Sequence, residues 1–266
     1  MTMRPLTEFP RATPIKGVLA DIDDTLTTHG RLQVDAYAAM QRLHDAGLMV
    51  IPITGRPAGW CDHIARMWPV AGVVGENGAF WMRHDDERRK LVKRFVVDDS
   101  TRAANRARLA VIGQMIVQAV PGAALASDQL YRETDLAIDW CEDVPPLPRP
   151  AVDRIVALME AEGMTAKVSS IHVNGWFGSY DKLAMTRALL RDAFAIDIEL
   201  DAVRRQFVFA GDSPNDAPMF AYFPLSVGVA NVRPFLDRIA TPPAFVTQRE
   251  GGAGFAELAA MLLASR

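Results

Sequence analysis

The stretch that decides the fold is V-L-A-D-I-D-D-T-L, at residues 18–26. A short apolar run ends there in the carboxylates of Asp21, Asp23 and Asp24. Such a run predicts a strand buried on both faces, as in a parallel sheet. Carboxylates packed this closely are costly to bury unless a cation or a reaction requires them. The end of this strand is therefore the predicted centre of a functional site.

The composition is that of a globular protein. Of the 266 residues, 50% are hydrophobic and 23% are charged, and the net charge of −3 gives no overall attraction to nucleic acid or to an anionic membrane. The sequence has no apolar run of about 18 residues, and residues 1–16 lack the apolar segment of a secretory signal. Cys61 and Cys141 lie far apart and are expected to be reduced thiols. These features predict a cytoplasmic protein, monomer or homodimer, with no nucleic-acid or membrane partner.

Strands and helices alternate along the first part of the chain. Helices are predicted at residues 33–46 and about 58–68, and strands at residues 48–54 and 72–74. This alternation predicts a parallel α/β sheet with right-handed crossovers.

The pattern changes near Arg83, where residues 83–90 are almost all charged and predict an exposed hinge or loop, with a solvated turn as the default. The following elements are less parallel in character, and the α/β alternation resumes near residue 180. We therefore predict a core at residues 1–83, an inserted α/β module at 84–178 and the rest of the core at 179–266. The elements predicted after the change are strands at 91–97, 130–140 and 206–210, one strand or a hairpin at 165–177, and helices at 100–119, 151–162 and 182–195.

The inserted sheet is predicted to have one apolar and one polar face. Leu136, Ile138 and Trp140 alternate on the apolar side of the strand at 130–140. If the module folds over the core, its polar face covers the site and suits the hydroxyls of a polyol. A solvated sheet face is the alternative for each residue taken singly. The polar face carries Tyr131, Glu133, Asp135, Ser170, His172 and Asn174.

Reactive groups follow the core strands or begin its helices. Ligands of open α/β sheets bind at the carboxyl ends of the strands, so the joint appearance of these groups predicts one site. Each alone is more readily a cap, a turn or a solvated residue. The groups are Asp21 with Asp23, Thr54, Lys182, and Asp212 with Asp216.

Two familiar cation and phosphate motifs do not fit. An EF-hand beginning at Asp21 would need glycine at Leu26 and glutamate at Leu32. A phosphate-binding loop would need GxxxxGK[ST], which the sequence lacks.

The sequence closely resembles the haloacid dehalogenase-like (HAD) superfamily of aspartyl-phosphate phosphohydrolases. Further segments resemble signatures of its subclass IIB, the Cof-like or sugar-phosphatase type. The resemblance implies a doubly wound, Rossmann-like parallel-sheet core with an α/β cap inserted between the second and third motifs. The four motifs are D-I-D-D-T at 21–25, I-T-G-R at 53–56, the lysine of Y-D-K at 180–182 and G-D-S-P-N-D at 211–216; the further segments are E-N-G-A at 76–79, V-G-V-A-N at 227–231 and V-T-Q-R-E-G-G at 246–252.

The implied activity is Mg²⁺-dependent hydrolysis of a small phosphomonoester, such as a sugar phosphate, through an aspartyl phosphate. Asp21 would attack phosphorus, and Asp23 would protonate the leaving alcohol and then activate water. Thr54 and Lys182 would stabilise charge on the phosphoryl oxygens.

An oxygen-rich Mg²⁺ site is implied at the same place. Its expected ligands are Asp21, Asp212 and the backbone carbonyl of Asp23, with Asp216 as a direct or water-mediated ligand and Asn215 as a water-mediated one. Asp24 stands where many relatives have glycine, and a structural role in the turn is expected. The candidate substrate contacts are Arg56, Asn77, Ser170, His172, Asn174 and Asn215.

Two other function classes remain open from the sequence. A phosphosugar mutase uses similar chemistry but returns the phosphoryl group to the substrate. A non-catalytic phosphate-binding or signalling module, such as a receiver domain, also uses an acidic pair, a threonine and a lysine. Receiver domains are about half this length, and a stable phospho-switch has little use for an acid/base such as Asp23.

Overall fold

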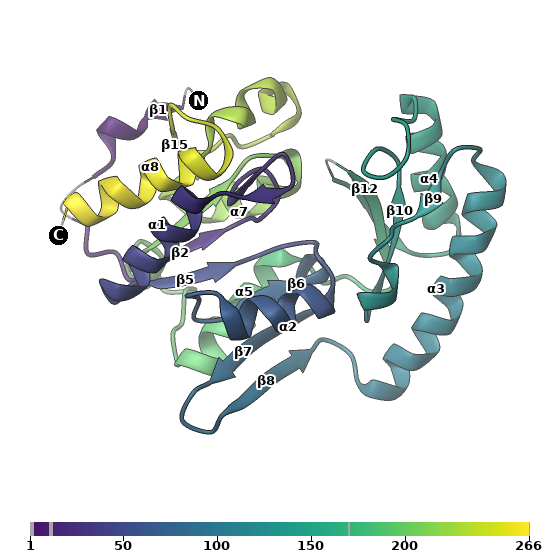
Figure 1. Cartoon of the computed structure of the whole chain (residues 1–266), viewed down its shortest axis with the longest axis horizontal. Coiled ribbons are helices and arrows are strands. Elements are labelled where there is room, and N and C mark those ends of the chain that lie inside the picture. Colours follow the sequence, from purple (N-terminus) through teal and green to yellow (C-terminus); the bar gives the residue numbers. More distant parts are fainter. Residues whose placement is uncertain (1–2, 11–12, 170, 266) are drawn as a thin grey trace.

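Two sheets of different character organise the molecule (Figure 1). The computed structural model describes residues 3–10, 13–169 and 171–265. The predicted helices appear as α1 (Val34–Asp45), α2 (Ala58–Met67), α3 (Asp99–Ala119), α4 (Arg149–Ala161) and α5 (Lys182–Phe194). Among the described residues, no helix combines the length and the hydropathy that a membrane span needs.

The larger sheet is parallel. Over the described residues its strand order is β1–β15–β14–β13–β2–β5, and a bridge from Ile53 to Val74 joins β6 (Val73–Gly75) to its edge. In the register, Ala20 pairs with both Ala210 and Pro52, so the residues that follow three strands lie side by side. The strands are β1 (Arg4–Pro5), β2 (Gly17–Ala20), β5 (Met49–Pro52), β13 (Phe207–Gly211), β14 (Ser226–Gly228) and β15 (Phe245–Val246).

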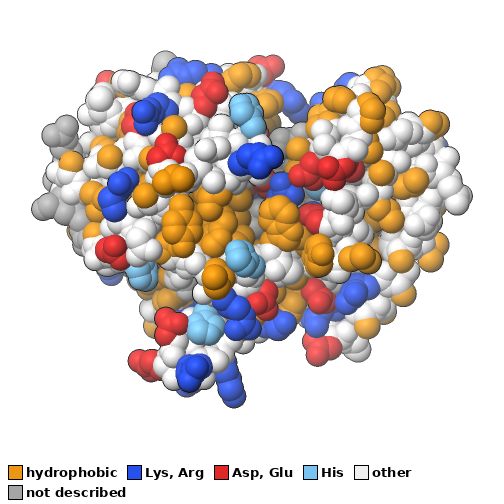
Figure 2. Space-filling model, viewed as in Figure 1, with side chains coloured by type: hydrophobic (Ala, Val, Ile, Leu, Met, Phe, Trp, Pro, Cys, Tyr) orange, Lys and Arg blue, Asp and Glu red, His pale blue; other side chains and the backbone are white. Residues whose placement is uncertain are grey.

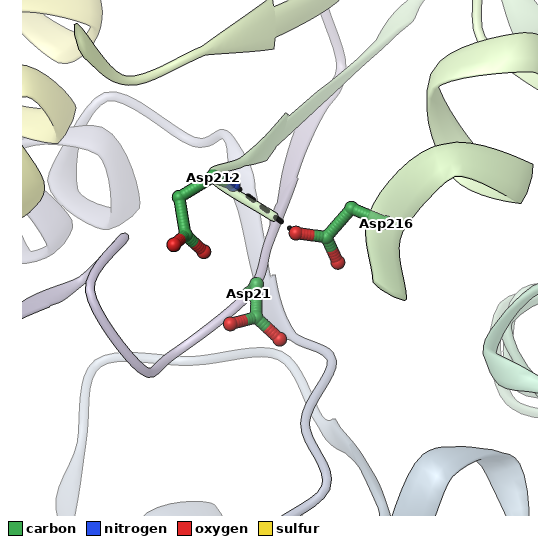
Figure 3. Close-up of side chains that lie close together, drawn as sticks. All are labelled: Asp21, Asp212 and Asp216. Carbon is green, nitrogen blue, oxygen red and sulfur yellow. Dashed lines mark hydrogen bonds between the residues drawn. The ribbon is translucent and has the colours of Figure 1, made fainter. Parts of the chain in front are cut away.

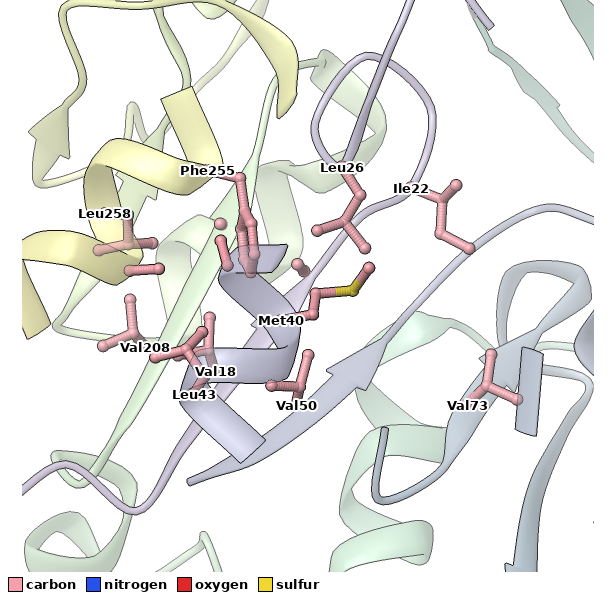
Figure 4. Packing of buried hydrophobic residues seen from close by; sticks show 14 of the residues in the cluster. Val18, Ile22, Leu26, Met40, Leu43, Val50, Val73, Val208, Phe255 and Leu258 are labelled. Atoms are coloured by element: carbon pink, nitrogen blue, oxygen red, sulfur yellow. The ribbon is translucent and has the colours of Figure 1, made fainter. Parts of the chain in front are cut away.

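Helices cover both faces of the parallel sheet. Val18 and Ala20 of β2 pack in a cluster with α1, α2 and α8 (Gly251–Ala264), which Figure 4 shows in part. Leu19, between them, belongs to a second cluster with α5 and α7 (Ala217–Tyr222). Successive side chains of a strand point to opposite faces, so an apolar run without alternation is what this double burial requires. The prediction of a doubly wound α/β core is confirmed.

Short elements complete the core. A two-stranded hairpin follows Asp21, and a one-turn helix precedes β13. The 3-10 segments lie mainly at the ends of core strands. These elements are η1 (Leu6–Glu8), β3 (Thr27–Thr28), β4 (Arg31–Leu32), η2 (Glu76–Gly78), α6 (Asp201–Arg204), η4 (Pro214–Asp216) and η5 (Ala230–Arg238).

The charged segment at residues 83–90 is the tip of a hairpin. The strands β7 (Phe80–Asp85) and β8 (Lys90–Phe95) pair antiparallel and extend from β6. Phe80 and Phe95 pack with α2 in the core cluster, so this segment is a solvated turn of the core and not a hinge. The predicted boundary between residues 83 and 84 runs through β7. The division of the chain into 1–83, 84–178 and 179–266 stays a prediction.

The smaller sheet is antiparallel, with the order β11–β12–β10–β9 over the described residues. The helices α3 and α4 cover one face, where their apolar side chains pack with Leu136, Ile138 and Val173. We call residues 98–178, which hold this sheet and its two helices, the cap. Its strands are β9 (Ala124–Leu125), β10 (Asp135–Asp139), β11 (Thr165–Val168) and β12 (His172–Trp176).

The predicted strand at 130–140 forms only in its second half. Residues Gln129–Tyr131 make a 3-10 turn, η3, and the strand begins at Asp135. The N–H groups of Glu133 and Thr134 donate to the carboxylate of Glu76 in the core instead of to a neighbouring strand. A contact with the distant core thus overrides the local alternation of polar and apolar residues.

Candidate active site

Two parallel strands bring the first carboxylates together. Asp21 directly follows β2 and Asp212 directly follows β13, and the backbone N–H of Asp21 donates to Ala210 O at 3.0 Å. Asp216 ends η4, the turn that follows Asp212. One carboxylate oxygen from each of the three residues lies within 4.8 Å of the others. Figure 3 shows the three side chains close together. We call Asp21, Asp212 and Asp216 the acidic cluster.

Lys182 provides a positive charge in the acidic cluster. Its Nζ donates to Asp21 Oδ1 at 2.7 Å and to Asp216 Oδ1 at 3.0 Å. Lys182 is the first residue of α5, whose N-cap Asp181 accepts the N–H of Ala184 at 2.7 Å. This N-cap residue fixes the point at which α5 begins, and therefore the position of Lys182.

Asp212 and Asp216 are held by the turns around them. Asp216 Oδ2 accepts the N–H of Asp212 at 3.1 Å, drawn as the dashed line in Figure 3. A Cβ at Gly211 would lie 2.5 Å from that oxygen, so the turn needs glycine there. Asp212 itself accepts a hydrogen bond from Thr25 Oγ1 at 3.1 Å and one from Asn231 Nδ2 at 3.3 Å. The carboxylates therefore have fixed orientations.

The acidic cluster carries more negative charge than Lys182 balances. Burial raises the pKa of Asp21 to about 8, although the ion pair with Lys182 acts in the opposite direction. Burial, followed by the charges of Asp216 and Asp21, raises the pKa of Asp212 well above its usual range. Burial disfavours charge on Lys182, but Asp21 and Asp216 outweigh it and raise the pKa of Lys182. One lysine facing three buried carboxylates leaves a site that fits a hard divalent cation such as Mg²⁺.

Asp23 binds an arginine and stays outside the acidic cluster. Arg56 donates to its carboxylate from Nε at 3.0 Å and from Nη2 at 2.8 Å. The same Nη2 donates to Glu142 Oε1 of the cap at 3.2 Å. Glu142 Oε2 lies 2.9 Å from His172 Nε2, and this contact lowers the pKa of Glu142 to about 2, with Arg56 acting in the same direction. A chain of charged groups thus connects the cap to Asp23.

Thr54 and Asn77 shape the end of the next strand. Thr54 is fully buried, and its Oγ1 accepts the N–H of Arg56 at 3.0 Å. The N–H of Asn77 donates to Thr54 O at 3.0 Å, and Asn77 has a φ of 56°, which asparagine tolerates better than most residues. Both residues are therefore fixed where the chain passes from β5 and β6 toward the cavity.

Core and cap residues line one small cavity above these strand ends. The polar face of the cap sheet contributes His172 and Asn174, and the core contributes the carboxylates. Lys182 and Asp216 adjoin through their bonds to Asp21 and Asp212. The predicted site residues that line the cavity are Asp21, Asp23, Arg56, Asn77, His172, Asn174, Asp212 and Asn215.

Other residues predicted on the polar face have different surroundings. Tyr131 lies in η3 and is 59% exposed, and Glu133 pairs with Arg106 at 3.2 Å on the surface. Asp135 is buried between Arg132 and Asn174. Ser170 lies outside the described residues.

Asp24 takes part in the turn after Asp21. Its φ is 56°, and its Oδ1 accepts the N–H of His29 at 3.1 Å. Aspartate tolerates this left-handed backbone through such local hydrogen bonds. The arrangement fits the structural role expected of Asp24.

Some residues at the site were not singled out from the sequence. Glu142 follows a strand in a loop without any motif, and nothing local indicates that it reaches Arg56. Asn231 has a local signal, since it ends V-G-V-A-N after β14 at the same edge of the sheet. Its Nδ2 donates to Asp24 O at 2.9 Å as well as to Asp212.

Comparisons with known proteins agree with this architecture. Residues 18–102 match the family model of haloacid dehalogenase-like hydrolases. Among solved structures, protein 0175 of Thermoplasma acidophilum superposes with a TM-score of 0.70 at 18% identity, covering 94% of this chain and 98% of that one.

Two phosphatases also superpose over most of the chain. The sucrose-phosphatase of Synechocystis sp. PCC6803, solved with sucrose and phosphate, gives a TM-score of 0.62 at 16% identity and covers 94% of this chain and 98% of that one. A HAD subclass IIB sugar phosphatase gives 0.61 at 12% identity and covers 92% and 97%. A search of curated proteins gave no match. At these sequence identities the similar structures show only that the fold is shared. Residues 18–102 thus resemble the haloacid dehalogenase-like hydrolases in sequence, and nearly the whole chain shares the fold of a solved HAD phosphatase.

Proposed function

We propose that the protein is a Mg²⁺-dependent phosphatase that hydrolyses a small phosphomonoester, of the sugar phosphate class, through an aspartyl phosphate. The observation that carries the proposal is the acidic cluster with Lys182 Nζ at 2.7 Å from Asp21 Oδ1. The sugar phosphate class is suggested by the sucrose-phosphatase and the sugar phosphatase that share this fold.

Asp21 is the proposed nucleophile. It must attack as the carboxylate, and Lys182 alone leaves its pKa near 8. We assign Asp21, Asp212, Asp216 and the backbone carbonyl of Asp23 to hold Mg²⁺. The bound ion would supply positive charge that keeps these carboxylates ionised and screens the phosphoryl oxygens. The ester then loses its alcohol, and water releases phosphate from Asp21.

Asp23 is the proposed acid and base. It gives a proton to the leaving oxygen and later takes one from the attacking water. In the described arrangement Arg56 occupies its carboxylate, so Asp23 must exchange this partner for the substrate. Thr54 and Lys182 are assigned to the phosphoryl oxygens, where charge develops during transfer. Arg56, Asn77, His172, Asn174 and Asn215 stay candidate substrate contacts, together with Ser170.

The test is phosphate release from a panel of sugar phosphates and other phosphomonoesters. Asp21→Asn should lower the rate by at least about 1,000-fold, because the amide is not a nucleophile toward phosphorus. Asp24→Asn is the matched control, since asparagine also tolerates a φ of 56° and can accept the same N–H. This control should keep most of the activity.

Three results would contradict the proposal. Substantial turnover by Asp21→Asn would contradict the assignment of Asp21 as the nucleophile. Full activity in EDTA would contradict the requirement for Mg²⁺. Isomerised substrate without stoichiometric inorganic phosphate would indicate a mutase.

A further inference from the structure

A groove with aromatic walls opens beside Asp23 and Arg56. It runs along α2 and is lined by Trp60, Trp68 and the cap residue Tyr131. Its volume is about 500 Å³, which falls in the range of small-molecule sites. The cavity above Asp21 measures about 40 Å³ and has no room for a sugar ring. A substrate larger than its phosphoryl group therefore has to extend into a neighbouring space.

The proposed chemistry places the leaving group on the side of Asp23. A general acid must lie about 2.6–3.2 Å from the oxygen that it protonates. Asp23 and Arg56 line the aromatic groove as well as the small cavity. They also line a further opening, which carries the carboxylates Asp24, Glu142 and Asp143 against Arg31. The leaving alcohol is uncharged, so the aromatic groove offers it an apolar surface, whereas in the carboxylate-rich opening it would displace water from charged side chains. The aromatic groove is therefore favoured.

The aromatic side chains offer surface to a ligand. Trp60 is 42% exposed although the Arg56 guanidinium lies 4.5 Å from the centre of its ring, and Tyr131 is 59% exposed. Gly59 permits this arrangement, because a Cβ there would lie 3.0 Å from Tyr131 Cβ. Figure 2 shows hydrophobic side chains gathered on this face of the core, between the regions where Figure 1 places α1 and α2.

We propose that the groove binds the leaving group of the substrate, and that this group contains a ring whose flat C–H or π face stacks on Tyr131 and Trp60. The inference rests on the proposed phosphatase function, because Asp23 fixes where the alcohol begins. A sugar ring and an aryl ring share this chemistry. Tyr131 belongs to the cap and Trp60 to the core, so the ring of the ligand contacts both units when they are together.

The experiment compares kcat/KM for hexose 6-phosphate, 1-naphthyl phosphate and the ringless glycerol 3-phosphate. In Tyr131→Ala the ratio of ring to ringless substrate should fall about five-fold, the usual size of one aromatic contact. The matched control is Leu130→Ala, because Leu130 is 90% exposed and does not line the groove. Tyr131→Phe should restore the ratio. The two ring substrates show whether the groove prefers a sugar or an aryl group.

A binding measurement separates this inference from the proposed function. Titration calorimetry measures the Kd of hexose 6-phosphate and of 1-naphthyl phosphate for the Asp21→Asn variant. For the ligand that binds in the groove, the Kd should be about five-fold higher in the double variant that also carries Tyr131→Ala. If the wild type hydrolyses nothing but this difference appears, the phosphatase proposal fails and the ring site stands. Unchanged Kd values and ratios overturn the ring site. An equal loss for ring and ringless substrates also overturns it, since Tyr131 would then act only on cap position.

Discussion

At the scale of single residues, the main feature of the site is its excess of buried negative charge. Asp21 and Asp212 have raised pKa values because they are buried, and Asp216 adds a third carboxylate. Lys182 contributes one positive charge. A buried charge without compensation is expensive, so the acidic cluster should cost stability until a cation binds.

This imbalance predicts a pH-dependent effect of Mg²⁺ on stability. The pKa of Asp21 rises from 3.8 to about 8 on folding, so without Mg²⁺ the folded state holds the extra proton between these values and stability falls as pH rises through that window. Mg²⁺ binds the ionised carboxylates, so its stabilising effect should grow with pH. At about 100 times its Kd it should add about 3 kcal/mol, or roughly 5–10 °C in Tm, at pH 8 and less at pH 5.

Differential scanning calorimetry with and without Mg²⁺ measures this effect. Asp212→Asn should lose most of the shift, whereas Asp35→Asn, in the first turn of α1, should keep it. An equal shift in wild type and Asp212→Asn would mean that Mg²⁺ binds elsewhere.

At the scale of elements, close backbone contact positions the start of α5. Gly78 in η2 has a φ of 106°, and a Cβ there would lie 2.0 Å from Asp181 O. Asp181 caps α5, and Lys182 follows it directly. The E-N-G-A segment therefore sets the place of the lysine by packing against the helix that carries it.

Gly78→Ala should destabilise the protein by about 3 kcal/mol, because it adds a clash with rigid backbone to the cost of a positive φ. Gly47→Ala measures the cost of the positive φ alone, since Gly47 has a φ of 77° and a Cβ there would have nothing within 4 Å. That variant should lose about 1 kcal/mol. Urea unfolding measures both, and equal losses would show that the contact with Asp181 is unimportant.

At the scale of the whole molecule, a buried network joins cap and core. Arg132 pairs with Asp128 and Asp135 at 3.0 Å each and donates to Gly55 O of the core at 3.0 Å. Glu76 of the core accepts the N–H groups of Ala58, Glu133 and Thr134, together with the hydroxyl of Thr134. Burial raises the pKa of Glu76 to about 7. Cap position is thus set by polar groups that are costly to separate.

Arg132→Met should destabilise the protein by about 3–5 kcal/mol, because it removes the guanidinium that pairs with the buried carboxylates of Asp128 and Asp135. Arg106→Met is the matched control. Arg106 is half-exposed and pairs with Glu133 on the surface, so its loss should stay within about 0.5 kcal/mol. Chemical denaturation measures both variants. Small-angle scattering should show a larger radius of gyration for Arg132→Met, since a contact from cap to core is also lost. An unchanged radius would show that Arg132 does not set the position of the cap.

The sequence by itself determined the core and the reactive strand ends. Runs such as residues 17–20 carry no polar alternation, and only a strand covered on both faces satisfies them. Asp21 and Asp212 each directly follow such a run, and parallel pairing brings the two ends together. The spacing of Leu136 and Ile138, and of His172 and Asn174, likewise indicated which side of the cap sheet is apolar and which is polar.

The tertiary structure alone decided how the cap meets the core. Glu142 reaches Arg56 over 86 residues of sequence, and Glu76 binds Thr134 over 58. No local pattern encodes such pairs, because their energy exists only when both side chains are buried together. The same reason explains why the strand predicted from residue 130 begins at Asp135. The N–H groups of Glu133 and Thr134, which precede it, donate to the carboxylate of Glu76 in the core instead of to a neighbouring strand.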